Sequence, residues 1–216
     1  MAATGSCVIE EQLLDPEFDF LHPLFYTNPY ALRCELAQGD TWDERLKSAR
    51  QRARQIYEIL FPNGADAITF DYMYDSGNPK EMKRIARVLP SVLKKYRHVC
   101  IKGLRSGEEG YEEYESWRRD RIVCYSDGIG FDDFAVIDKQ AGVDDDLLSN
   151  AYRSIGADIC LVSEKNECIM CVYDDRGCDI VFATHEKLRE FYPLLRPYFL
   201  LYDLEEMERR YNGDEE

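Results

Sequence analysis

Long apolar runs are missing from this chain of 216 residues. None approaches the ~18 consecutive apolar residues that a helix needs to cross a bilayer, which argues against a transmembrane segment. The first residues also lack the basic cluster and apolar core of a secretory signal, so we expect a cytoplasmic protein. Its eight cysteines fit this location. Their spacing resembles no disulfide framework, and thiols stay reduced in the cytosol.

Recognisable catalytic motifs are also missing. The sequence contains no glycine-rich phosphate loop, no nucleophile elbow and no metalloprotease helix motif. Its histidines, His22, His98 and His185, have no motif partner. Carboxylate pairs are so frequent in an acidic chain that a single pair has little specificity for acid–base catalysis. The sequence therefore predicts no catalytic residue and no cofactor.

Four cysteines in the last third of the chain suggest a zinc site: Cys160, Cys168, Cys171 and Cys178. Structural zinc sites use two close pairs of ligands on tight turns. Here the close pair, Cys168 and Cys171, falls in a predicted strand, where residues three apart point to opposite faces. This geometry argues against a metal site.

Basic residues are few relative to acidic ones. The chain has 27 Lys and Arg against 42 Asp and Glu, a net charge of −15 and a pI near 4.7. Such a chain is repelled by phosphate backbones and anionic lipid, and attracted to basic partners. We therefore expect a basic protein partner, and the charge argues against nucleic acid and membranes. With 45% hydrophobic residues, the composition also excludes a disordered or fibrous protein.

The charge is unevenly distributed along the chain. Residues 105–146 hold thirteen acids against five bases, whereas residues 80–102 hold eight bases against one acid. One explanation is a solvated surface on which a basic helix partly neutralises the acidic segments. The other is a docking face, because aromatic rings among carboxylates anchor a basic partner that the negative field steers. The candidate aromatic residues of this face are Tyr111, Tyr114, Trp117 and Tyr125.

Hydrophobic periodicity predicts both strands and helices. Alternating or continuous apolar runs predict strands at 30–36, 68–74, 100–101, 121–125, 134–137, 159–162, 169–173, 180–183 and 198–202. Helical spacing and end signals predict helices at 41–60, 78–96, 144–155, 185–195 and 204–211. Pro90 should kink or split the second of these helices. The segregated runs favour an α+β fold, an antiparallel sheet with helices packed on it in a single compact domain.

The ends of the chain differ from its middle. Residues 1–28 should be irregular, because prolines interrupt an aromatic cluster there. Residues 29–211 should form the domain, and residues 212–216 an acidic tail. The weakest pattern, at 105–117, marks the place where a break between two subdomains would fall.

The sharpest local feature is the run Asp174-Asp175-Arg176-Gly177. As a hairpin turn, its first aspartate would bond the backbone, Gly177 would adopt a positive φ and Arg176 would pair with a neighbouring acid. As a site, two carboxylates beside a guanidinium would recognise a charged partner or hold a metal. Turn chemistry explains every residue type and is favoured, and Asp174, Asp175 and Arg176 remain candidate binding residues.

Segments at both ends of the domain carry a family resemblance. They are Leu24–Tyr26, Leu32–Leu36, Arg52–Ala53, Leu60–Phe61, Val172–Ile180, Phe191–Tyr192 and Leu201–Asp203. Together they resemble a bacterial domain of unknown function, number 3885, over about residues 22–211. Cys34 stands where the family usually has an aromatic residue. The resemblance implies a bacterial, cytosolic, single-domain α+β protein and carries over no catalytic residue.

Two functional hypotheses follow from these patterns. The first is a non-enzymatic, acidic protein-binding module, for example an immunity-type inhibitor of a basic toxin. The alternative is a hydrolase or metal-dependent enzyme, which requires one cluster of charged residues to converge in a pocket. That cluster comprises Arg33, Glu35, Asp174, Asp175, Arg176 and Asp179. A third idea, nucleic-acid binding by the basic helix Lys80–Lys95, is disfavoured by the overall charge.

Overall fold

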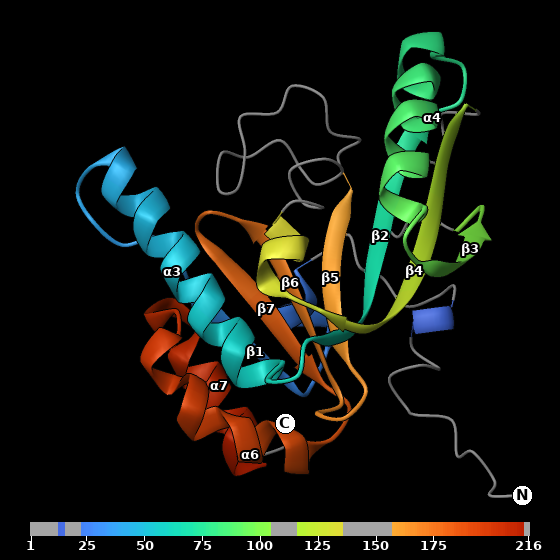
Figure 1. Cartoon of the computed structure of the whole chain (residues 1–216). Coiled ribbons are helices and arrows are strands. Elements are labelled where there is room, and N and C mark those ends of the chain that lie inside the picture. Colours follow the sequence, from blue (N-terminus) through green and yellow to red (C-terminus); the bar gives the residue numbers. More distant parts are fainter. Residues whose placement is uncertain (1–12, 16–22, 105–115, 136–156, 214–216) are drawn as a thin grey trace, which may run out of the picture.

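A seven-stranded antiparallel sheet forms the centre of the molecule (Figure 1). The structure is a computed structural model, and it describes residues 13–15, 23–104, 116–135 and 157–213. The strand order is β1-β7-β6-β5-β2-β4-β3, and helices pack on the sheet within one domain. This confirms the predicted α+β fold.

The sheet consists of two groups of strands, one on each side of β2. Their bounds are β1 (Ala31–Glu35), β2 (Ala65–Asp75), β3 (Arg97–Lys102), β4 (Trp117–Ile129), β5 (Asp158–Ser163), β6 (Cys168–Asp174) and β7 (Gly177–Phe182). The last three strands, which were predicted at 159–162, 169–173 and 180–183, form an antiparallel meander, and β1 adds to its β7 edge. Strand β2 pairs with both β4 and β5 and so connects this group to β4 and β3.

Four helices lie close to the predicted positions: α3 (Trp42–Leu60), α4 (Pro79–Leu93), α6 (His185–Leu195) and α7 (Leu204–Asn212). Helix α2 (Leu24–Thr27) lies where the sequence predicts an irregular segment. Two 3-10 turns follow α6, η2 (Arg196–Tyr198) and η3 (Leu201–Asp203). Thr41 and Glu44 form the expected capping box of α3. Helix α4 continues through Pro90, so this proline does not split it. None of the described helices is long and apolar enough to cross a membrane.

The two faces of the sheet differ in character. Successive residues of a strand point to opposite faces, so Leu32 lies on one face of β1 and Arg33 on the other. Helices α3 and α6 cover the face of Leu32, where Phe182 of β7 stacks on Phe191 of α6 with ring centroids 5.4 Å apart (Figure 1). Helix α2 packs on the opposite face, since the Phe25 amide bonds Asp179 there. This second face carries the charged side chains.

The strand predicted at 134–137 is wrong in its described part. Residues 131–135 are helical, and strand β4 runs on to Ile129, past the end of the strand predicted at 121–125. The reason is packing: Phe131 and Phe134 are three residues apart and lie edge-to-face at 6.0 Å, and Phe131 contacts Tyr57 of α3. The helix predicted at 144–155 lies outside the described residues.

The strand predicted at 198–202 is also wrong. The segment forms η2 and η3, and Phe199 makes an isolated bridge to Cys34. Phe199 and Leu201 would share one face of a strand, but Phe199 is 5% exposed and Leu201 is 78% exposed, so the run does not have the consistently buried face of a strand. The segment nevertheless covers the free edge of β1.

The chain just before β2 lies very close to β4 at Gly64, and a substitution there tests this close approach. The φ of Gly64 is +88°, and a Cβ there would lie 2.8 Å from the Gly128 Cα of β4. Gly103 is a matched control, because its φ is also positive, +66°, and its Cβ would meet nothing within 4 Å. We expect Gly64→Ala to lower the free energy of unfolding by about 1–3 kcal/mol more than Gly103→Ala does. Urea unfolding measures both, and equal losses would contradict the close approach.

Candidate functional site

A row of polar side chains crosses the second face of the sheet. In register it runs Arg33, Asp179, Cys171, Cys160 and Thr69, on β1, β7, β6, β5 and β2. Residues directly opposite one another in an antiparallel pair point to the same side, so these five share one face. Each is less than 9% exposed. The interior here therefore contains the buried polar groups of Arg33, Asp179 and Thr69 beside two core cysteines.

At one end of the row, Arg33 and Asp179 form a bidentate ion pair. Arg33 Nε and Nη2 donate to the two carboxylate oxygens of Asp179 at 2.8 and 3.0 Å. Arg33 also lies 3.5 Å from Asp203, and the Phe25 amide donates to Asp179 at 3.0 Å. Burial alone would lower the pKa of Arg33, but the hydrogen bonds and charge of Asp179 outweigh it and raise that pKa. Arg33 therefore stays charged inside the protein.

A second buried cluster lies on the same face, around Asp71 of β2. Arg119 of β4 donates to both Asp71 oxygens, at 2.8 and 3.1 Å, and Arg121 donates to one of them at 2.9 Å. Asp71 and Arg121 are fully buried. Arg121 also donates to the carbonyl oxygens of Leu13 and Asp15, at 3.3 and 2.7 Å. The cluster thus fixes an amino-terminal segment to the sheet.

A cleft of about 680 Å³ opens on this polar face. Cys171 and Ile159 contribute to its lining from the sheet, and Leu24 and Leu200 contribute from the segments beside it. Its charged lining residues are Arg33, Glu35, Arg45, Asp158, Asp174, Arg176 and Asp179. The cleft therefore presents both signs of charge around a partly apolar interior.

The turn predicted from the sequence lies at this cleft. Asp174 accepts from the backbone amide and the Nε of Arg176, both at 2.7 Å, as the turn chemistry predicts. Asp174 is buried, whereas the side chain of Arg176 is 74% exposed. Asp175 is 3.6 Å from Arg45, which also lines the cleft. The turn thus places one exposed guanidinium at the cleft.

The prediction of a positive φ at Gly177 is wrong, because Gly177 is not among the described glycines with positive φ. A close approach explains the glycine instead. A Cβ at this position would lie 2.6 Å from the Cys34 carbonyl oxygen and would overlap the Tyr173 hydroxyl. Position 177 therefore requires a glycine because there is no room for a side chain.

The candidate aromatic face is not assembled at the cleft. Trp117 and Tyr125 lie on β4, which is separated from the β6–β7 hairpin by β2 and β5. Trp117 is 36% exposed, and Arg97 lies over the Tyr125 ring at 5.0 Å. Tyr111 and Tyr114 lie outside the described residues.

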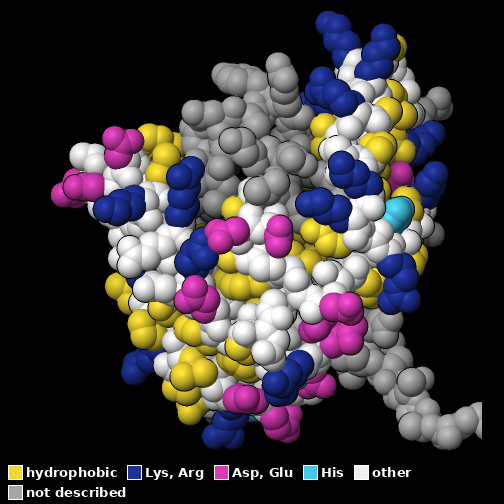
Figure 2. All heavy atoms as spheres, viewed as in Figure 1, with side chains coloured by type: hydrophobic (Ala, Val, Ile, Leu, Met, Phe, Trp, Pro, Cys, Tyr) yellow, Lys and Arg dark blue, Asp and Glu magenta, His cyan; other side chains and the backbone are white. Residues whose placement is uncertain are grey.

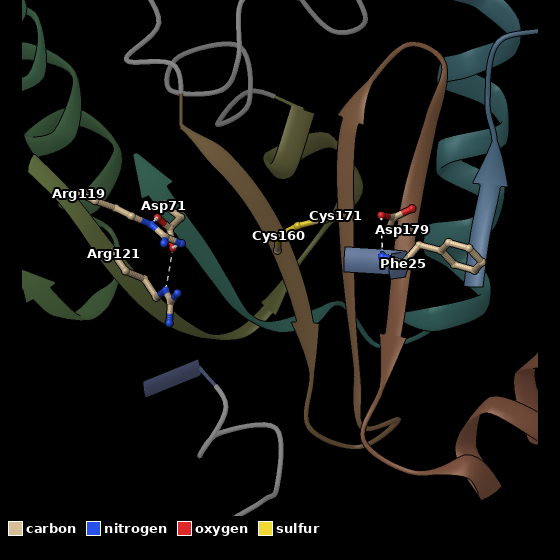
Figure 3. Close-up of a disulfide and its surroundings, with 7 residues drawn as sticks. All are labelled: Phe25, Asp71, Arg119, Arg121, Cys160, Cys171 and Asp179. Atoms are coloured by element: carbon tan, nitrogen blue, oxygen red, sulfur yellow. Dashed lines mark hydrogen bonds and ion pairs between the residues drawn. A yellow bond between two sulfur atoms is a disulfide. The ribbon is translucent and has the colours of Figure 1, made fainter. Parts of the chain in front are cut away.

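The expectation of reduced thiols is contradicted at one pair. Cys160 and Cys171 are directly opposite on β5 and β6, with Cα atoms 4.3 Å apart, and form a disulfide. Figure 3 shows it between the Asp71 cluster and Asp179. Spacing of eleven residues along the chain gave no sign of this pairing. No group of three or more His, Cys, Asp or Glu side chains suited to a metal occurs among the described residues.

The sequence analysis missed the Asp71 cluster. Asp71, Arg119 and Arg121 occupy alternate positions of their strands. In a half-buried strand charged residues at such positions usually face solvent, so the alternation alone does not predict that they are buried. The available signal was that Asp71 lies within the strand predicted at 68–74 and Arg121 begins the strand predicted at 121–125, so an acid and a base could pair across two strands.

These observations define the class of the protein. It is an α+β protein with a polar cleft over one face of a seven-stranded antiparallel sheet. The family model described as "Domain of unknown function (DUF3885)" matches residues 11–203. The chain belongs to this family, as its sequence resemblance suggested. No curated protein and no solved structure matches it.

The buried pair at the cleft yields a stability prediction. Asp179→Asn leaves Arg33 charged and poorly paired, so we expect a loss of about 3–5 kcal/mol in the free energy of unfolding. Asp132→Asn is the control: Asp132 is 85% exposed in its ion pair with Arg54, and we expect a loss of about 0–1 kcal/mol. Urea unfolding at neutral pH measures both. A loss below about 1 kcal/mol for Asp179→Asn would contradict a buried, essential pair.

The disulfide yields a chemical prediction. Protein that is denatured without reductant, alkylated and digested should give one linked pair of peptides containing Cys160 and Cys171. The other described cysteines should be recovered as alkylated thiols: Cys34, Cys100, Cys124, Cys168 and Cys178. Recovery of alkylated Cys160 and Cys171 in protein purified under air would show that the two do not pair.

Proposed function

We propose that this protein is a non-enzymatic protein-binding module whose cleft takes up a charged segment of a partner protein. The observation that carries the proposal is that two aspartates of the cleft are buried in ion pairs, whereas two of its arginines are exposed. Asp179 and Asp174, which are buried, are held by arginines. Arg176 and Arg45 reach the surface, with side chains 74% and 39% exposed.

The same pairing argues against acid–base chemistry at these aspartates. A general base needs a lone pair within hydrogen-bond reach of the proton that it removes. Asp179 already accepts two hydrogen bonds from Arg33 and one from the Phe25 amide. The residues of the hydrolase hypothesis do converge, since five of the six line the cleft. Their contacts are those of a rigid recognition surface.

The charge of the chain supports a basic partner. The described residues carry 24 Lys and Arg against 26 Asp and Glu, so most of the net −15 belongs to the remaining segments. A negative field of this size accelerates the encounter with a cationic protein and weakens as salt rises. The concrete form of the proposal is a bacterial, cytoplasmic immunity-type inhibitor that covers the active site of a basic toxin.

The test is binding to a partner that has been identified and purified. Affinity capture at low salt supplies the candidate, and calorimetry with the purified pair measures the affinity. The segment that enters the cleft would carry both signs of charge, and its carboxylates would pair with Arg45 and Arg176. We therefore expect Arg45→Glu with Arg176→Glu to weaken binding at least tenfold, or about 1.4 kcal/mol, even though the substitutions make the protein more acidic. Lys165→Glu is the control, because Lys165 is exposed in the β5–β6 turn and does not line the cleft.

Two results would contradict the proposal. One is an identified partner that binds the double variant and the wild-type protein equally well. The other is turnover of a small ester, phosphoester or glycoside by the purified protein that Glu35→Gln abolishes. The second result would instead support the hydrolase hypothesis.

A further inference from the structure

A second charged surface lies far from the cleft, on the segment that we call the basic arm, residues 78–102. It comprises α4, β3 and the connection between them. Its eight Lys and Arg face a single acid, Glu81, which gives a local charge of +7. Figure 2 shows dark blue side chains gathered over α4. In Figure 1 this helix lies beside β2 and β4 and reaches away from the other helices.

Helix α4 separates its apolar and basic residues. Ile85, Val88 and Leu89 are buried on one side. Lys80, Lys83 and Arg87 are exposed and recur every three or four residues, so at 3.6 residues per turn they form one stripe on the opposite side. Neighbouring charges of the stripe lie about one turn, or roughly 5 Å, apart.

The stripe is not neutralised within the described part of the chain. Lys80, Lys83 and Arg87 make no ion pair there, and the single acid of the arm, Glu81, pairs with Arg84 at 3.4 Å. The basic surface continues past the helix. Lys94 and Lys95 follow it, and β3, which is an edge strand, carries further exposed bases. Altogether the cations extend over about 20 Å.

We propose that the basic arm binds the phosphate backbone of nucleic acid, without reading its sequence. Regularly spaced cations on one face are the feature that neutralises a polyanion and releases its counterions. The overall charge of −15 argues against such a partner, but the arm itself carries a local charge of +7. At physiological salt the Debye length is about 8 Å, so a phosphate backbone in contact with the arm meets mainly the field of the nearest charges.

The structure favours nucleic acid over a membrane surface. A helix that lies in a lipid interface must insert its apolar face. The apolar side of α4 is already occupied, because Ile85, Val88 and Leu89 belong to the hydrophobic core. Apart from Met82 and Val99, which are 38% and 44% exposed, the arm offers charge to a partner, and cation–phosphate contacts position a protein on nucleic acid without reading its sequence.

The experiment measures fluorescence anisotropy of labelled duplex DNA and single-stranded RNA, each of about 20 nucleotides per strand, at about 50 mM salt. We expect the full chain to bind with a Kd in the micromolar range that rises steeply with salt. The variant Lys80→Glu, Lys83→Glu, Arg87→Glu should bind at least tenfold more weakly. Its log–log salt slope should be shallower by about 2–3, since each lost phosphate contact contributes about 0.9.

The control variant is Lys47→Glu, Lys165→Glu, Arg189→Glu, which changes the net charge equally at exposed positions outside the arm. It should retain most of the affinity. Both variants are first checked for wild-type circular dichroism and unfolding midpoint, and a variant that fails is replaced by single substitutions at the same positions. The proposal is overturned by three results: no binding at about 50 mM salt, equal losses in both variants, or binding to anionic phosphatidylglycerol vesicles alone.

Discussion

The structure depends on the pairing of charges inside the protein. One face of the sheet buries Asp71, Arg121, Arg33 and Asp179 where most sheets would bury apolar side chains. An unpaired charge there would cost several kcal/mol, so each must find a partner of opposite sign with good geometry. The partners come from distant parts of the sequence. Asp203 joins from the last third of the chain, and the carbonyl groups of residues 13 and 15 join from its start. The pairs therefore connect the ends of the chain to the sheet.

The same pairing shapes the cleft and its chemistry. Because Arg33 and Asp174 are committed to neighbouring groups, they form rigid walls rather than reactive groups. Arg176 and Arg45 present charge at the surface beside them. The cleft and the basic arm lie on different parts of the sheet, and they suit different partners. A protein segment of mixed charge fits the first, and a polyanion fits the second.

The sequence predicted those elements in which local signals agree with tertiary packing. Helix α3 has a capping box and an apolar stripe, and the β5–β7 meander has apolar strands around polar turns, so both could be predicted. The errors arose where a long-range contact decides the outcome. Phe134 joins a helical turn because it packs with Phe131, and Gly177 is a glycine because the Cys34 carbonyl lies close. The Cys160–Cys171 pairing depends on strand register, which the spacing of the cysteines does not reveal.

The central claim is that charge pairs inside the sheet are coupled, and a double-mutant cycle between Arg33 and Asp179 tests it most directly. The cycle compares Arg33→Met, Asp179→Leu and the double variant with the wild-type protein by urea unfolding. We predict a coupling free energy of about 2–3 kcal/mol, with the double variant more stable than the sum of the single losses implies. A coupling below about 0.5 kcal/mol would show that the two residues act independently and would contradict this account.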